Sequence, residues 1–217
     1  MLSLLIASLS LLAPQTPLTS QDDVVWGITS YEHNSSYPAS MELSNDNGRI
    51  ENGYVFVGGN GSRMACKYDL PGSGYRYLTT VKYYTKPNWP NTAFEGFGVC
   101  CWKYINNLPG AIIWPGAGQY VYNHNTGGGW ITQSVAPAFD LQIYNSFLVG
   151  IWQLYNYPSC DSFGYDDRGA NEQDWANPAG SGWSRAPYGH GTARAVLSQS
   201  FSSVETTTIG SIRALYR

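Results

Sequence analysis

The sequence predicts an all-β fold, an antiparallel β-sandwich, and two observations carry this prediction. The first is composition: 15% of the 217 residues are aromatic and only 12% are charged, with 24 Gly and 12 Pro. Such a chain makes many turns and buries large rings, which excludes coiled coils, collagen and helical bundles. The second is a pattern of short apolar or alternating runs bounded by Gly, Pro, Asn and Asp, which is typical of strands and turns.

Ten segments carry the strand pattern: residues 24–31, 53–57, 64–69, 75–85, 94–104, 111–114, 130–136, 147–155, 160–165 and 192–197. Within 75–85, alternation predicts a solvated face bearing Arg76, Thr80 and Lys82. The opposite, buried face is predicted to hold Tyr75, Tyr77, Thr79, Val81 and Tyr83. The run FLVGIWQLY at 147–155 has no polar face, so it is predicted to be a central strand.

These strands are predicted to form one domain, residues 21–198, because a sheet must cover its apolar face and no linker divides the chain. We expect two packed sheets in a sandwich of jelly-roll type. The connections 86–92, 115–129 and 166–188 are predicted to be long loops. The polar segment 33–49 is predicted to be a surface excursion.

The two ends of the chain differ from the middle. Residues 2–13 form an uncharged apolar run, too short to span a bilayer but typical of the core of a signal peptide. We predict a signal peptide over 1–20 and a secreted protein, extracellular or at the cell surface. A buried N-terminal segment is the alternative. In the tail 199–217, apolar residues at helical spacing predict a short C-terminal helix, and a frayed tail is the alternative.

The charge balance bears on the kind of partner. The chain has 12 basic and 15 acidic residues and a formal net charge of −3. This provides no electrostatic attraction for a phosphate backbone, so nucleic acid is not expected as a partner. After the first run, no apolar stretch is long enough to cross a bilayer, so no membrane insertion is expected once the signal is removed.

The order of several short motifs resembles a known kind of module. GFGVCCW is followed by PGAIIWP, then by GGGW, FLVGIWQ and SFGYDD, and finally by GW and RAVL. This layout is similar to the secreted jelly-roll modules of bacterial surface and extracellular proteins, of the carbohydrate-binding-module kind. The resemblance covers most of residues 23–198. It implies a fold and a class of role, and it assigns no individual residue.

Four cysteines occur in the chain, Cys66, Cys100, Cys101 and Cys160. In an exported protein they are able to form disulfides, with three connectivities open, and buried free thiols are the alternative. A zinc site is disfavoured, because there is no C-x-x-C pair. Cys100 and Cys101 are adjacent on a predicted strand, so they point to opposite faces and are not expected to lie together in the core.

Acidic residues gather in one predicted loop region and supply the hard oxygen ligands that calcium prefers. A structural calcium site is predicted from Asp161, Asp166, Asp167, Glu172 and Asp174. The alternative is that these residues are ordinary turn formers. Glycoside hydrolysis needs two opposed carboxyl groups. Glu95 lies among apolar residues, but no alternation pairs carboxylates along a strand, so no catalytic residue is assigned.

The aromatic surplus carries the sharpest functional prediction. Sugar rings present apolar faces and polar edges, so a sugar site needs flat rings for stacking and a few amide or charged groups. Several Trp residues lie in or beside Gly-, Pro- and Asn-rich segments with polar neighbours. The predicted ligand-binding residues are Trp175, Trp183, Trp89, Trp130, Arg185 and Asn177. The alternative is that these rings shield loops and sheet edges.

The function predicted from these patterns is a secreted, non-catalytic binding module for a carbohydrate or cell-surface polymer. The alternative is an extracellular or cell-surface structural subunit that assembles with copies of itself or binds a protein partner. A glycoside hydrolase is third. A shallow aromatic groove beside free amide groups would favour the first, whereas rings spread over flat sheet faces would favour the second.

Overall fold

A computed structural model describes residues 40–57, 59–90, 95–124, 127–167, 173–187 and 189–200. All of them belong to the compact unit Ala39–Arg217, and the unit Met1–Pro38 lies outside the described residues. The predicted signal peptide, the predicted strand 24–31 and almost all of the predicted C-terminal tail therefore lie outside them as well.

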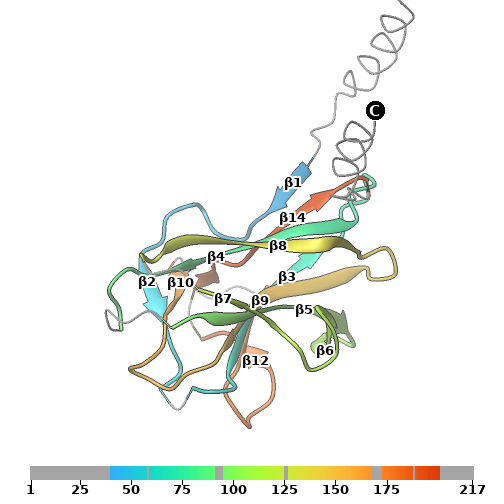
Figure 1. Ribbon diagram of the computed structural model, residues 1–217. Coiled ribbons are helices and arrows are strands. Elements are labelled where there is room, and N and C mark those ends of the chain that lie inside the picture. The colour runs from blue at the N-terminus through green and yellow to red at the C-terminus, as the bar shows by residue number, and fades with distance from the viewer. Residues whose placement is uncertain are drawn as a thin grey trace, which may run out of the picture. The chain divides into compact units, whose positions relative to one another are not determined.

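Within the described residues the fold is all-β, with antiparallel pairing throughout and no helix, as the composition predicts. The strands form three sheets where the sequence predicts two (Figure 1). The first, in pairing order, consists of β1 (Ser40–Leu43), β14 (Arg194–Ser198), β4 (Tyr77–Thr85) and β8 (Gly129–Asp140). The second consists of β13 (His190–Gly191), β10 (Phe163–Asp166) and β2 (Asn52–Tyr54).

The third sheet has seven strands and carries the features that matter for function. In order they are β12 (Ser184–Arg185), β11 (Asp174–Asn177), β3 (Arg63–Asp69), β9 (Ser146–Gln153), β5 (Phe97–Ile105) and β6 (Leu108–Trp114), and β7 (Val121–Asn123) also pairs with β5. β9 lies between β3 and β5, which confirms the predicted central strand. No helix in the described part of the chain is long and apolar enough to cross a membrane.

For the first half of β4, the prediction of which side chains are buried is wrong. Tyr75, Leu78, Val81 and Tyr83 are buried, whereas Tyr77 and Thr79 are partly exposed. The pairing of β4 with β8 shifts register between Leu78 and Thr80. An irregularity of this kind reverses which alternate side chains point inward. The prediction is therefore correct for Tyr75 and, beyond the irregularity, for Val81 and Tyr83, and it is wrong for Tyr77 and Thr79.

The four-stranded and seven-stranded sheets share one hydrophobic core. It contains inward side chains of both, including Val81, Leu197, Val99 and Val149, and Phe163 of the small sheet. The opposite face of the seven-stranded sheet is also covered, and it forms a second cluster. The second cluster consists of Ala65, Cys100, Trp102, Ile112, Leu148 and Trp175.

This double burial explains the cysteines. Cys101 lies in the first cluster and Cys100 in the second, so the two do point to opposite faces. The expectation that they would not both be buried is wrong, because both faces of their sheet are covered. All four cysteines are buried and free, so the disulfide prediction is not supported. Burial raises the pKa of the Cys66, Cys100, Cys101 and Cys160 thiols, which disfavours the reactive thiolate.

Several short strands lie where loops are predicted. β1 lies within the segment 33–49, β7 within 115–129, and β11 and β12 within 166–188. β1 pairs with β14, and its Glu42 accepts hydrogen bonds from Arg194 of β14 and from Lys82 of β4, the next strand of the sheet. Such short polar strands are held by ladder bonds and side-chain pairs, so they lack the apolar alternation on which strand prediction depends.

Candidate functional site

The predicted aromatic residues do not meet in one hollow. Trp175 is only 3% exposed, and the Arg185 guanidinium lies 4.1 Å from the centre of its ring. Trp183 is half-buried and packs edge-on against Trp102, with ring centres 5.5 Å apart. An exposed platform of Trp175 and Trp183 would need both rings at the surface. Trp175 does not meet this condition, so the pair is not carried into the proposed site.

The remaining predicted ligand-binding residues are scattered. Trp89 and Trp130 are exposed, and Trp130 packs against Tyr84 and lies 4.0 Å beneath the Arg194 guanidinium. Asn177 is nearly buried at the end of β11, where it pairs with Arg63 of β3. The Trp130 ring is therefore covered in part by Tyr84 and Arg194.

The predicted calcium residues are divided in the structure. One carboxylate oxygen from each of Asp166, Asp167 and Glu51 lies within 4.8 Å of the others. Asp161 and Asp174 are buried outside this group, and Asp174 accepts a hydrogen bond from the Gly191 N–H. Glu172 lies outside the described residues. Neighbouring carboxylates alone do not define a cation site, so no metal is assigned.

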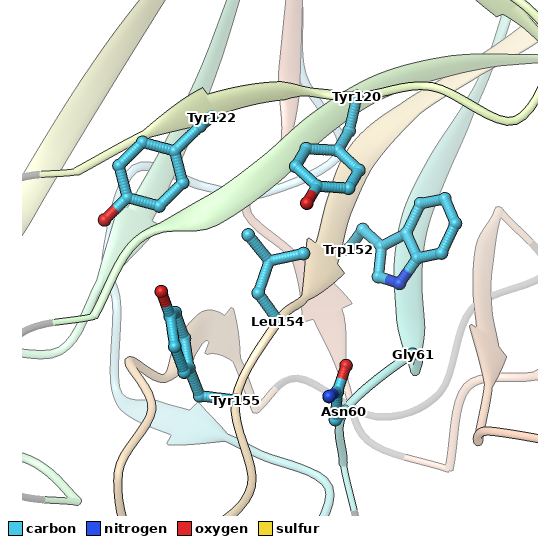
Figure 2. Close-up of a pocket in the computed structure, with 7 residues that line it drawn as sticks. All are labelled: Asn60, Gly61, Tyr120, Tyr122, Trp152, Leu154 and Tyr155. Atoms are coloured by element: carbon cyan, nitrogen blue, oxygen red, sulfur yellow. The ribbon is translucent and has the colours of Figure 1, made fainter.

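The structure instead brings aromatic residues together in a hollow of about 580 Å³ on the outer side of the seven-stranded sheet (Figure 2). Tyr120 and Tyr122 form one wall, and Tyr155 with the loop at Asn60 forms the other, with Leu154 between them. The complete lining is Asn60, Gly61, Tyr120, Tyr122, Trp152, Leu154 and Tyr155. We name this hollow the aromatic pocket.

Two glycines make room for the first wall: Gly98 within β5, and Gly96 immediately before β5. β7 pairs with β5, and Gly98 lies opposite both Tyr122 in β7 and Trp152 in β9. A Cβ atom at Gly98 would lie 2.6 Å from Cγ of Tyr120, and one at Gly96 would lie 2.8 Å from the ring of Tyr122. Both distances are shorter than van der Waals contact. The two rings therefore lie directly over the backbone of the sheet.

Trp152 forms the end of the pocket nearer to β3. It projects from β9 beside Tyr120, with ring centres 5.4 Å apart in an edge-to-face arrangement. The Arg63 guanidinium stacks on the indole at 4.1 Å. These contacts hold a partly exposed indole in one orientation, which a binding surface requires.

The second wall is held by a buried glutamine. Gln153 has no exposed surface, and its amide accepts a hydrogen bond from the Phe56 N–H and donates to the carbonyls of Phe56 and Tyr155. Nearby, the Asn60 N–H donates to the side chain of Asn156 at 2.8 Å. The two loops of this wall are thereby tied to each other and to β9.

The chemistry of the pocket is aromatic and polar without charge. Its seven lining residues supply three phenol hydroxyls, one carboxamide and broad ring surfaces, and none of them is Asp, Glu, Lys, Arg or His. Tyr120, Tyr122 and Tyr155 are 42%, 51% and 39% exposed, so their rings are accessible. Burial raises the pKa of Tyr155, as does the charge of Glu95, so its hydroxyl stays protonated and able to donate.

Sequence patterns did not select these residues. Tyr120 and Tyr122 lie in a segment predicted to be a loop, and Trp152 and Tyr155 lie in a run predicted to be a central strand without a polar face. The alternation Tyr120-Val121-Tyr122 beside a glycine-rich turn is a weak strand signal. It would have placed both tyrosines on one face, but not over the pocket.

We expect Gly98→Ala to disturb the pocket without unfolding the protein. The added methyl group would force Tyr120 outward, and this ring is free to move because it is exposed. The free energy of unfolding should fall by about 1 kcal/mol. A shift in the tyrosine fluorescence and in the NMR signals of Tyr120 and Trp152 would measure the displacement.

Gly72→Ala is the matched control, because a Cβ atom there meets nothing within 4 Å and the backbone is not strained. Unchanged Tyr120 signals in Gly98→Ala would contradict the described stacking.

Comparisons with known proteins do not extend this description. A scan against protein-family models, a search of curated proteins and a search of solved structures each found no match.

Proposed function

We propose that the protein is a secreted, non-catalytic binding module and that the aromatic pocket binds carbohydrate. The observation that carries the proposal is the convergence of four accessible or half-buried rings in one uncharged hollow. Pyranose rings have apolar C–H faces that stack on aromatic side chains, while their hydroxyls bond to phenol and amide groups. Asn60 and the tyrosine hydroxyls supply such groups.

The other parts of the proposal rest on separate observations. A jelly-roll sandwich with two main sheets agrees with the antiparallel pairing and the shared core, although a small third sheet is present. The resemblance to carbohydrate-binding modules agrees with a pocket on the outer side of a sheet. Secretion rests on the apolar run 2–13. The non-catalytic role rests on the sequence, in which no alternation pairs carboxylates along a strand.

A structural or partner-binding subunit is the second candidate, and one observation favours it. The hairpin joining β5 and β6 exposes about half of the surface of Ile105 and of Leu108. Exposed aliphatic side chains at a hairpin tip are typical of contacts with another protein. Sedimentation that shows a stable oligomer of the mature chain would favour this candidate.

We expect Tyr122→Ala to weaken glycan binding by about tenfold or more. One stacked ring contributes on the order of 1 kcal/mol beyond the area that it buries, and tenfold corresponds to about 1.4 kcal/mol. The melting temperature should change little, because Tyr122 is half exposed. A glycan array on residues 21–217 identifies the ligand, and calorimetric titration then measures the affinity.

Trp89→Ala is the matched control, since Trp89 is an exposed ring outside the pocket. It should bind as the unmodified protein does. Equal losses in both variants, or no loss in Tyr122→Ala, would show that the pocket is not the carbohydrate site.

A further inference from the structure

Arg63 borders the aromatic pocket at its Trp152 end. In the strand pairing it lies between Asn177 of β11 and Trp152 of β9, and it follows two residues after Gly61, which lines the pocket. Its guanidinium contacts the Trp152 ring at 4.1 Å. Since residues directly opposite each other in antiparallel strands share one face of a sheet, Arg63 lies on the same outer face as Trp152 and Gly98.

This cation has no anionic partner in the described part of the chain. Arg63 forms no salt bridge with any of those residues, and its Nε is buried without a hydrogen-bond partner among them. The indole beneath it fixes the plane of the guanidinium but offers no acceptor, because its nitrogen only donates. A partly buried cation whose N–H groups lack acceptors costs solvation energy, which a bound anion would offset.

A second arginine is held in the same way further along this face. Arg185 of β12 is exposed, and its guanidinium stacks on Trp175 at 4.1 Å. It too forms no salt bridge with any residue that the structure describes. Lys67, which also stacks on a ring of this face, pairs with Asp69 at 2.7 Å. Arg63 and Arg185 therefore keep no carboxylate partner among the described residues, although the chain has more acidic than basic residues.

The strand register gives the spacing of the two arginines. Trp175 pairs with Arg185 on one side and with Ala65 on the other, and Ala65 lies two residues after Arg63 in β3. The arginines are thus separated by two strand spacings, about 10 Å, and by two residues along the strands, about 7 Å. A chain of a few sugar units spans this separation.

We infer that the aromatic pocket binds an acidic polysaccharide built of uronic acids, and that Arg63 binds the carboxylate of the sugar unit next to Trp152. The inference rests on the proposed carbohydrate site and adds its substrate class. A planar carboxylate matches the paired N–H groups of a guanidinium, which a neutral sugar does not. Arg185 binds a second carboxylate of the same chain beyond the pocket. The net charge of −3 repels a polyanion in general, so a preference for the acid requires local contacts of this kind.

The test uses hexasaccharides of galacturonate, glucuronate and mannuronate, each compared with its full methyl ester by calorimetric titration at about pH 7, where the acids are ionised. The ester keeps the rings and linkages and removes only the charge. The unmodified protein should bind at least one acid about tenfold or more tightly than its ester. Arg63→Gln should abolish this preference and keep the affinity for the ester. Arg185→Gln should weaken binding of the acid about threefold, and an unchanged affinity would remove Arg185 from the site.

Arg49→Gln is the control, because it removes the same charge from an exposed arginine outside the pocket and outside the seven-stranded sheet, and it should keep the preference. Equal affinities for every acid and its ester, or binding confined to neutral or sulfated glycans on the array, would overturn the uronate inference and leave the carbohydrate site intact. Binding of none of the oligomers, together with an empty glycan array, would overturn both. The comparison of acid with ester needs no variant, so it decides the question even if Arg63→Gln does not fold.

Discussion

Replacing Gln153 by leucine is expected to lower the free energy of unfolding by about 4 kcal/mol. Leucine is similar in size but offers no hydrogen bonds, so the Phe56 N–H and the carbonyls of Phe56 and Tyr155 lose the partner that they share. A buried polar group without a partner costs about 1 to 3 kcal/mol, and water reaches part of this loop region. Urea unfolding would measure the difference, provided that the slope of the unfolding free energy against urea concentration is the same for both proteins.

The same change should impair ligand binding, because Gln153 ties Tyr155 to the loop that carries Asn60. Gln142→Ala is the control: Gln142 is exposed and its side chain contacts Arg76 at the surface. Its unfolding midpoint should stay close to that of the unmodified protein, within about 0.5 kcal/mol. If the two variants unfolded at the same midpoint, Gln153 would not hold the second wall.

Asp161→Asn is expected to stabilise the protein above neutral pH. Asp161 is 3% exposed, and one of its carboxylate oxygens has no hydrogen-bond partner among the described residues. Burial raises the pKa of its carboxyl from 3.8 to about 7, the hydrogen bond from the Glu95 N–H lowers it, and the charge of Glu95 raises it. The folded protein therefore prefers the protonated form.

The sign of the pH dependence follows from this preference. Below about pH 4 the folded and unfolded chains both hold the proton, so the group has no effect on stability. Between about pH 4 and pH 7 only the folded chain holds it, and its contribution falls by about 1.4 kcal/mol per pH unit. Above pH 7 the loss is complete. Asparagine has no such loss, so the variant should be more stable by up to about 4 kcal/mol at about pH 8.

Thermal melts at about pH 4.5, 6 and 8 would measure this difference. The gap between Asp161→Asn and the unmodified protein should grow as pH rises and vanish at the acidic end. Asp140→Asn is the control, since Asp140 is an exposed carboxyl that forms an ion pair with Arg76 at the surface. A gap that is independent of pH would show that Asp161 is ionised in the folded protein throughout the range.

The strands with apolar alternation were predictable because that signal is local. β3, β5, β8 and β9 lie at the predicted places, with ends shifted by a few residues. The register irregularity in β4 was not predictable, since it depends on pairing with β8 and not on the sequence of β4 alone. Short strands such as β7 and β11 were missed because neighbouring strands, and not their own composition, hold them extended.

Exposure of the rings was the least predictable property. Trp175 has loop-like neighbours in the sequence, yet Arg185 and the second cluster cover it. Trp152 belongs to a run without a polar face, yet it remains partly exposed in the pocket, where the residue opposite it on β5 is Gly98. Whether a ring is accessible depends on the size of residues opposite it in space, which no local pattern records.

The sequence by itself determined the all-β class, the central place of β9 and the low net charge of the chain. Period-two alternation, turn residues and net charge are properties of the amino-acid sequence and do not depend on tertiary contacts. Only the tertiary structure decided the site. Asn60, Tyr120 and Trp152 are far apart in the chain, and they meet because antiparallel pairing places β3, β9, β5 and β7 side by side.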